Sequence, residues 1–159
     1  MTELATLAGG CFWGVEELFR QQPGVISTIV GYTGGQRPNP IYEQVKTGVT
    51  GHAEAIQVSF DPTKTSFRDI LLFFFKMHDP TTLNRQQNDR GTQYRSAIFY
   101  HDATQKQCAI DVISEAQKQW PAPIVTAVEP ASTFFEAEAY HQKYLVKNPD
   151  GYNCHYVRK

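Results

Sequence analysis

Residues 3–19 read ELATLAGGCFWGVEELF, and this run predicts a strand, a tight turn and a helix in immediate succession. The strand covers Glu3 to Ala8 and ends at Gly9-Gly10, because two adjacent glycines favour a turn. Apolar residues of the helix then recur at helical spacing, and they are Val15, Leu18 and Phe19. Pro23-Gly24 is expected to end this helix.

The rest of the chain continues to alternate between strand and helix patterns. Val25 to Val30 is β-branched and nearly continuous, which is typical of a strand covered on both faces. A period-two pattern predicts a strand whose inward residues are Glu54, Ile56, Val58 and Phe60. Further strands are expected at Ala97 to Tyr100 and at Ile124 to Val128.

Two long helices and a short helical tail complete the expected elements. Ser66 is the predicted N-cap of a helix that reaches Met77, and Asp102 is the predicted N-cap of the next one. Apolar residues at helical spacing extend that second helix, and they are Ala109, Val112, Ile113, Ala116 and Trp120. This order predicts an α+β fold, a two-layer α/β sandwich with a mixed sheet, two long functional loops and an irregular C-terminal tail.

Composition and length restrict the class of protein. The 159 residues are expected to form a single domain, residues 1–159, since no repeat or linker divides them. A net charge of −1 argues against binding to nucleic acid or anionic lipid. The longest apolar run, residues 70–75, is too short to span a bilayer. An odd count of three cysteines, with no signal peptide at the start, favours a reducing cytoplasm.

Two segments are longer than connections in so small a domain usually are. Residues 31–51 contain five glycines and two prolines, and residues 79–95 are almost wholly polar. Structureless loops beyond roughly 12–15 residues are uncommon in compact domains unless they are functional or disordered. Aromatic and carboxylate residues occur in both loops and favour the functional interpretation, although surface insertions without a role stay an alternative.

Cys11 lies between the strand and the helix, where a reactive thiol is well placed. Backbone N–H groups and the positive end of the helix dipole lower the pKa of a cysteine and favour the nucleophilic thiolate. The alternative is a small buried residue that allows tight packing beside Gly10 and Gly14. Trp13 falls off the apolar stripe and fits a platform for a small substrate group. Phe12 falls on the stripe, so both core and pocket remain open for it.

Cys154 is the second candidate thiol. It follows Pro149-Asp150-Gly151 in a segment that is expected to be mobile, which suits a resolving cysteine that must approach another sulfur. The alternative is a tail cysteine without a partner. Cys108 lies in the middle of an apolar helix and is interpreted as a packing residue.

Glu54 shares its strand face with apolar residues. A carboxyl group on such a face loses the solvation of its charged form, so its pKa rises and it can donate a proton near neutral pH. A glutamate at the strand end that reaches water is the alternative. His52 is interpreted as a residue that orients Glu54 or lies at the surface. Tyr42 and Tyr94 offer hydroxyls for a polar oxygen, or are packed aromatics with a wet tip.

Five motifs in this order resemble the type A peptide methionine sulfoxide reductases, which act on the S epimer. The motifs are GCFWG (10–14), YEQVKTGVTGHAE (42–54), DPT (79–81), DRGTQYRS (89–96) and AYHQKYL (139–145). They cover nearly the whole chain, including both long loops. The resemblance implies a single catalytic domain that reduces methionine-S-sulfoxide, protein-bound or free, to methionine in protein repair under oxidative stress.

The resemblance also implies a role for each candidate residue. Cys11 resembles the nucleophile that attacks sulfoxide sulfur, and Phe12 and Trp13 resemble the pocket for the S-methyl group. Glu54 matches the acid that protonates the sulfoxide oxygen, and Tyr42 and Tyr94 match the residues that bind this oxygen. Asp89 resembles a supporting polar residue near the substrate pocket.

The same resemblance implies the second half of the cycle. Sulfenic acid on Cys11 is resolved by Cys154, and thioredoxin reduces the resulting disulfide; no metal or organic cofactor is required. Many relatives carry a longer glycine-rich tail with a further cysteine, whereas this chain stops at His155-Tyr156-Val157-Arg158-Lys159. The absence of that tail favours a two-cysteine cycle. The protein is expected to be a monomer.

Other classes of protein remain as alternatives. A cysteine hydrolase would pair Cys11 with one of the five histidines, but no protease signature surrounds Cys11. A zinc site from Cys11, His52, Cys154 and His155 lacks short paired spacings. A peptide-binding module would use the aromatics but needs neither thiol, and the glycine-rich runs fit no phosphate-binding pattern.

Overall fold

The computed structural model describes residues 2–158, and its centre is a six-stranded sheet of order β7-β6-β1-β3-β2-β8. Its strands are β1 (Glu3–Gly9), β2 (Val25–Thr33), β3 (Ala53–Phe60), β6 (Ser96–Tyr100), β7 (Ala127–Pro130) and β8 (Phe135–Glu136). The pair of β6 and β7 is parallel and the other pairs are antiparallel, so the expected mixed sheet of an α+β fold is confirmed.

Helices and short turns connect these strands. The α-helices are α1 (Phe12–Phe19), α2 (Tyr42–Val45), α3 (Phe67–Met77), α4 (Ala103–Ala116) and α5 (Tyr144–Lys147). Three 3₁₀ turns lie at Thr92–Tyr94, Gln117–Gln119 and Ala139–His141. A two-stranded hairpin of β4 (Arg85–Gln86) and β5 (Asp89–Arg90) lies outside the main sheet. Among the described residues, no helix is long and apolar enough to cross a membrane.

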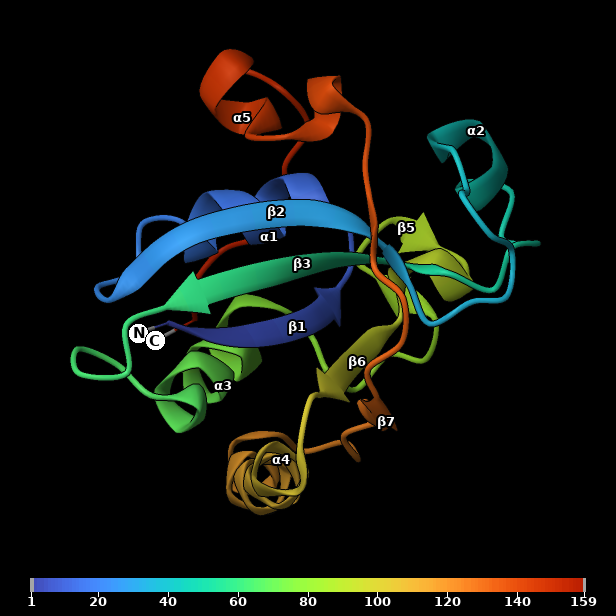
Figure 1. Ribbon diagram of the computed structural model, residues 1–159. Coiled ribbons are helices and arrows are strands. Elements are labelled where there is room, and N and C mark those ends of the chain that lie inside the picture. The colour runs from blue at the N-terminus through green and yellow to red at the C-terminus, as the bar shows by residue number, and fades with distance from the viewer. Residues whose placement is uncertain (1, 159) are drawn as a thin grey trace.

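The three longer helices cover one face of the sheet. Leu7 of β1 lies opposite Ile56 on one neighbour and Ile98 on the other, and all three belong to the core that includes the inward residues of α1, α3 and α4. Figure 1 shows β2, β3 and β1 side by side, with α1 behind β2 and α3 beside β1. Glu54 shares this helix-covered face with Ile56, because their side chains are two residues apart on β3.

The opposite face has a smaller cover. Ala8 and Ala97 face each other there and belong to a separate cluster with Phe99, against which Phe134 packs. Within residues 2–158, a continuous helical layer therefore covers one side of the sheet and not the other, which agrees with the expected two-layer sandwich.

This one-sided layer explains why the prediction that Val25 to Val30 is covered on both faces is wrong. Ile26 is 56% exposed and Ile29 is 38% exposed. The strand becomes buried on both faces only from Val30 to Thr33, where residues 134 and 135 pass over Gly31. A β-branched run thus predicted the strand correctly but not its cover.

Local end signals were predicted well, and the last strands less well. The Ser66 hydroxyl accepts a bond from the Asp69 N–H (3.0 Å), and Asp102 accepts one from the Gln105 N–H (2.8 Å), so both N-caps are confirmed. The second helix ends at Ala116, before Trp120, and passes into a 3₁₀ turn. The strand expected at 124–128 begins only at Ala127, and β8 was not predicted, because two residues carry no periodic pattern.

Candidate active site

Cys11 is the N-cap residue of α1, directly after β1. Gly10 precedes it with φ +100°, a left-handed conformation that L side chains rarely adopt. A Cβ at Gly10 would also lie 2.6 Å from Gln86 Cγ. The turn that aims Cys11 therefore requires glycine, and it leaves Cys11 as a residue only 9% exposed.

The pKa of Cys11 is raised, which contradicts the expectation from its place at a helix N-terminus. Burial is the largest cause, and the charge of Glu54 is the second. The backbone N–H of Trp13 lowers the pKa but does not outweigh them. In the free protein Cys11 is thus a thiol at neutral pH, because burial destabilises the thiolate by more than the backbone N–H donor stabilises it.

Glu54 is the buried carboxyl group of the site, and the alternative of a glutamate that reaches water is excluded. Its residue is 2% exposed, and its Oε1 accepts a hydrogen bond from the Phe12 N–H at 3.2 Å. The pKa of Glu54 is raised to about 8: burial is the largest cause, the Phe12 N–H opposes it, and the charge of Asp89 adds a smaller rise. The expected neutral carboxylic acid at pH 7 is confirmed.

Tyr42 and Tyr94 are brought into the electrostatic surroundings of Glu54 by the two long loops. Tyr42 begins α2, and Tyr94 ends the first 3₁₀ turn. Burial, followed by the charge of Glu54, raises the pKa of Tyr42 to about 12. The pKa of Tyr94 is raised by the same two causes in the same order. Both phenols are thus protonated and able to donate hydrogen bonds at neutral pH.

Phe12 and Trp13 point in different directions from the first turn of α1. Phe12 is 1% exposed and belongs to the core, with its ring centroid 5.7 Å from that of Tyr32. Trp13 is only partly buried and stacks on Tyr144 at 3.8 Å between centroids, with 9° between the planes. The structure thus places Phe12 in the core and leaves Trp13 partly exposed beside Cys11, as the expected platform requires.

His141 is a site residue to which the sequence assigned no role. Its Nδ1 accepts a hydrogen bond from Trp13 Nε1 at 2.9 Å, so the neutral ring carries its proton on Nε2. The ring is 1% exposed and lies 4.6 Å from the Tyr42 ring, and burial lowers its pKa. His141 thereby orients the tryptophan platform. The AYHQKYL motif contained it, but no periodicity marks a residue in a 3₁₀ turn.

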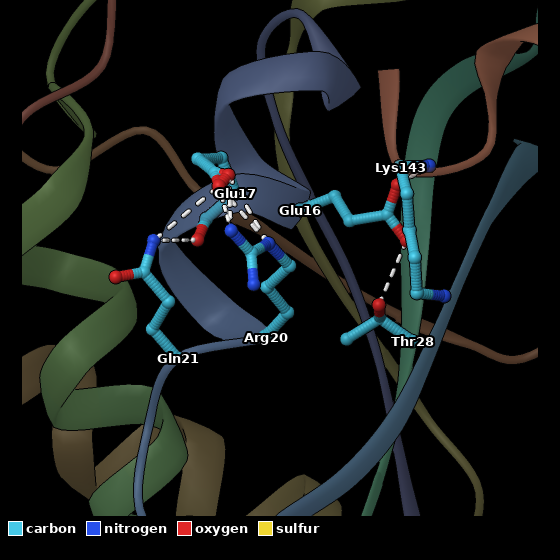
Figure 2. Close-up of polar contacts among 6 residues, drawn as sticks. All are labelled: Glu16, Glu17, Arg20, Gln21, Thr28 and Lys143. Atoms are coloured by element: carbon cyan, nitrogen blue, oxygen red, sulfur yellow. Dashed lines mark hydrogen bonds and ion pairs between the residues drawn. The ribbon is translucent and has the colours of Figure 1, made fainter. Parts of the chain in front are cut away.

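Glu16 is a second buried glutamate that holds the tryptophan platform indirectly. Its carboxylate accepts bonds from the Thr28 hydroxyl (2.7 Å) and from the backbone N–H of Lys143 (2.6 Å). Figure 2 shows Glu16 reaching toward these two residues, away from the surface group of Glu17 and Arg20. Since Lys143 precedes α5, Glu16 fixes the start of the helix whose first residue, Tyr144, stacks on Trp13.

His52 neither orients Glu54 nor lies at the surface, as the two expectations had it. It is 2% exposed, its Nδ1 accepts a bond from the Gly35 N–H (3.0 Å), and its Nε2 donates to the Arg37 carbonyl (2.7 Å). His52 therefore holds the first long loop in place. The position of His52 two residues before Glu54 was misleading, because the imidazole ring packs against the first long loop and not on the strand face of Glu54.

The C-terminal segment returns to the N-terminus of α1 and brings Cys154 close to the site. Cys154 is partly buried, and its charge is among the contributions that raise the pKa of Cys11. Its Sγ lies 3.6 Å from Oδ2 of Asp89, and the Tyr152 hydroxyl donates to the same oxygen at 3.2 Å. His155 Nε2 donates to the Gly9 carbonyl at 2.8 Å. The tail that the turn residues suggested to be mobile is thus held by several contacts.

The three cysteines are free thiols. Cys108 lies on α4, partly buried against the core, as its apolar surroundings predicted. Within residues 2–158, no three His, Cys, Asp or Glu side chains are grouped so that they could hold a metal ion. The zinc alternative is weakened further because both ring nitrogens of His52 are engaged by the loop.

The hydrolase alternative requires a histidine hydrogen-bonded to Cys11, and this arrangement is not found within residues 2–158. Among the described residues, no hydrogen bond joins Cys11 to a histidine. His141 bonds to Trp13, and His155 bonds to the Gly9 carbonyl. Cys11 instead shares its surroundings with a neutral carboxylic acid, phenol donors and a second thiol, which suits reduction of an S–O bond rather than hydrolysis.

Comparison with known proteins points to the same chemistry. Residues 3–159 match the family model described as peptide methionine sulfoxide reductase. The peptide methionine sulfoxide reductase MsrA of Mycolicibacterium paratuberculosis is 57% identical, over 99% of this chain and 91% of that protein.

Solved structures agree with this match. Mxr1 from Saccharomyces cerevisiae in reduced form has a TM-score of 0.96 and 41% identity, over 99% of this chain and 93% of that one. The same yeast protein in complex with Trx2 has a TM-score of 0.69 and 29% identity, over 99% of this chain and 91% of that one.

Proposed function

The chain belongs to the peptide methionine sulfoxide reductase family, and from this premise we propose how its residues perform the reduction. It is a type A enzyme, a thiol-dependent oxidoreductase that converts methionine sulfoxide to methionine with thioredoxin as reductant. The observation that carries the assignment of residues is the neutral, buried carboxyl group of Glu54. Glu54 accepts a hydrogen bond from the backbone N–H of Phe12, the residue that follows Cys11.

In the first step, Cys11 Sγ attacks the sulfoxide sulfur while Glu54 donates its proton to the sulfoxide oxygen. The thiol proton of Cys11 replaces the one that Glu54 has donated. The S–O bond of the substrate breaks, OH is transferred to Cys11, and methionine leaves. The substrate sulfur gains two electrons and the Cys11 sulfur loses two, so Cys11 ends as sulfenic acid.

The surrounding donors and aromatics set the substrate geometry. A sulfoxide sulfur becomes electrophilic when its oxygen is protonated or strongly hydrogen-bonded. Tyr42 and Tyr94 supply phenol donors for this oxygen, and Trp13, supported by His141 and Tyr144, supplies the apolar surface for the S-methyl group. Phe12 closes the core side of this surface. Fixed positions for methyl, oxygen and thiol select one epimer, methionine-S-sulfoxide.

In the second step, Cys154 resolves the sulfenic acid. Its thiol condenses with Cys11–SOH to form the Cys11–Cys154 disulfide and water. Thioredoxin then reduces this redox-active disulfide and restores both thiols. The contacts of the tail with Asp89 and Gly9 support this role, because they hold Cys154 close to the N-terminus of α1 before oxidation.

Substitution of the two cysteines tests these assignments. Cys11→Ser should form no methionine from a methionine sulfoxide peptide, because the hydroxyl does not accept the oxygen. Cys154→Ser should form one methionine per enzyme and then stop, with or without thioredoxin. Repeated turnover of Cys154→Ser with thioredoxin would exclude Cys154 as the resolving residue. Cys108→Ser is the control, and it should cycle like the wild type.

The wider setting is proposed on the same basis. We propose that residues 1–159 act as one catalytic domain, since the candidate site draws on the start, the middle and the C-terminal segment of the chain. We propose that this domain acts as a monomer. We also propose that the enzyme repairs oxidised methionine in proteins, or free, in the cytoplasm. Neither nucleic acid nor membrane is a proposed partner, in line with the net charge of −1.

A further inference from the structure

The surroundings of Cys154 suggest a base for the second step. Asp89 begins β5, and its Oδ2 lies 3.6 Å from Cys154 Sγ while it accepts a bond from the Tyr152 hydroxyl at 3.2 Å. His155 Nδ1 lies 3.7 Å from the same sulfur. The thiol is therefore flanked by a carboxylate and by an imidazole.

The second step needs such a base because the thiolate, not the thiol, is the nucleophile. Burial, the largest cause, raises the pKa of Cys154 to about 11, so little thiolate forms spontaneously at neutral pH. We infer that Asp89 is the catalytic base of the resolving step and takes the proton of Cys154 as this sulfur attacks Cys11–SOH. This inference rests on the proposed role of Cys154 and reassigns Asp89 from the substrate pocket.

Atoms and electrons balance in this step. The S–H bond of Cys154 breaks and its proton passes to the Asp89 carboxylate. The S–S bond forms, the S–O bond of Cys11 breaks, and the oxygen leaves as water with that proton. Cys154 sulfur is oxidised and Cys11 sulfur is reduced to the disulfide level, so no further reagent is needed.

His155 is less suited to be the base. The Gly9 carbonyl only accepts hydrogen bonds, so His155 Nε2 carries the proton and the lone pair of Nδ1 faces Cys154. A proton on Nδ1 would create a cation on a ring that is 7% exposed, and burial lowers the pKa of His155. Asp89, in contrast, takes the proton without creating a cation, and its Oδ2 lies 3.6 Å from the Cys154 sulfur.

His155 instead acts as a positioning residue. A Cβ at Gly14 would lie 2.5 Å from His155 Nδ1, and one at Gly10 would lie 3.1 Å from Nε2. These two glycines therefore leave the space that the imidazole fills. The bond to Gly9 then fixes the backbone next to Cys154 at the N-terminus of α1.

The two steps can be measured separately in one experiment. Enzyme is mixed with one equivalent of N-acetylmethionine sulfoxide without reductant and quenched at successive times. Methionine reports the first step, and the Cys11–Cys154 disulfide, measured by mass spectrometry, reports the second. The variants are Asp89→Asn, Asp89→Glu and Cys154→Ser. Tyr152→Phe is the matched control, because it removes the hydroxyl on Asp89 but keeps the carboxylate.

Asp89→Asn should slow disulfide formation ~10²–10⁴-fold more than methionine formation, the usual range for loss of a positioned base. Sulfenic acid on Cys11 should accumulate and be trapped by dimedone. Tyr152→Phe should slow the second step by less than about tenfold, the effect of one hydrogen bond. Asp89→Glu, which keeps a carboxylate, should recover part of the rate and shows that the site still folds.

Three outcomes would overturn the assignment of Asp89. They are disulfide formation at the wild-type rate in Asp89→Asn, equal slowing of both steps, and no recovery in a folded Asp89→Glu. Failure of the proposed function would look different. Cys154→Ser would then still lose two thiols per methionine formed, whatever Asp89→Asn does.

Discussion

At the scale of single residues, Cys11 and Glu54 act as a pair. Burial raises the pKa of each, and ionised Glu54 raises the pKa of Cys11 further. The proton on Glu54 therefore has two effects: it is available for the proposed transfer to the sulfoxide oxygen, and it removes a negative charge that opposes thiolate formation at Cys11. Both groups carry their protons at neutral pH, so the proposed first step must move both of them.

The first prediction at this scale concerns Glu54→Gln. An amide can donate a hydrogen bond but cannot transfer a proton, so the single-turnover rate of methionine formation should fall ~10²–10⁴-fold. In the wild type this rate should decline as the pH rises through about 8, because Glu54 then loses its proton. The variant should show no such decline. Methionine formation at the wild-type rate in Glu54→Gln would exclude Glu54 as the acid.

At the scale of elements, the single helix α1 organises the site. Cys11 is its N-cap, Trp13 carries the platform, and Glu16 binds the segment that leads into α5. Successive side chains leave a helix about 100° apart, so Phe12 points into the core, whereas Trp13 and Glu16, about one turn apart, both face the C-terminal segment. The eight residues of α1 thereby connect the proposed nucleophile, Cys11, to β1 and to the C-terminal segment.

Adjacent glutamates on α1 provide a matched test of this arrangement. Glu16→Ala removes two buried hydrogen bonds and should lower the free energy of unfolding by about 1–3 kcal/mol. It should also raise KM for the sulfoxide, because Tyr144 is held less firmly behind Trp13. Glu17→Ala, which removes an exposed pair with Arg20, should change stability by less than about 0.5 kcal/mol.

Thermal unfolding and steady-state kinetics of both variants check this difference. Equal loss of stability in the two variants, or an unchanged KM in Glu16→Ala, would contradict the role given to Glu16. The pair is informative because both residues lie on the same helix and lose the same charge.

At the scale of the whole molecule, the site forms where distant parts of the chain meet. The C-terminal segment crosses back to β1 and α1 through His155 and His141, whose partners lie 146 and 128 residues away. β3 supplies Glu54 from the middle of the sheet, and the two long loops add Tyr42 and Tyr94. The carboxyl group of Glu54 at this junction lowers the free energy of unfolding, because burial disfavours its charged form.

This cost predicts how the stability of the whole protein depends on pH. The pKa of Glu54 is about 8 in the folded state against 4.5 as the ordinary value, so the folded state binds the proton more tightly. Stability is therefore highest below pH 4.5 as far as Glu54 is concerned, and it is lost as the pH rises toward 8. The loss is on the order of 5 kcal/mol if the shift is fully expressed.

Urea unfolding of the wild type and of Glu54→Gln between pH 5 and 9 measures this loss. Glu54→Gln should become the more stable of the two as the pH rises. His78, whose pKa burial lowers to about 3, acts in the opposite direction at low pH but does so in both proteins, so the difference isolates Glu54. A difference that is independent of pH would contradict the buried, neutral state of Glu54.

Much of the fold and part of the site could be predicted because they depend on neighbours in sequence. The strand, turn and helix around Cys11, the caps Ser66 and Asp102 and the buried face of Glu54 follow from turn residues, end signals and periodicity. The cover of β2 could not be predicted, because a β-branched run does not show which elements pack on it.

The sequence by itself determined the α+β class, the thiol at a strand-to-helix turn and the acid on an apolar strand face. Only the tertiary structure decided that Cys11 is a buried thiol, that His141 and Tyr144 hold Trp13, and that Asp89 faces Cys154 across 65 residues. The physical reason is the distance along the chain over which each interaction acts. Backbone turns and periodicity act over a few residues, whereas desolvation and hydrogen bonds between distant segments exist only once the chain has packed.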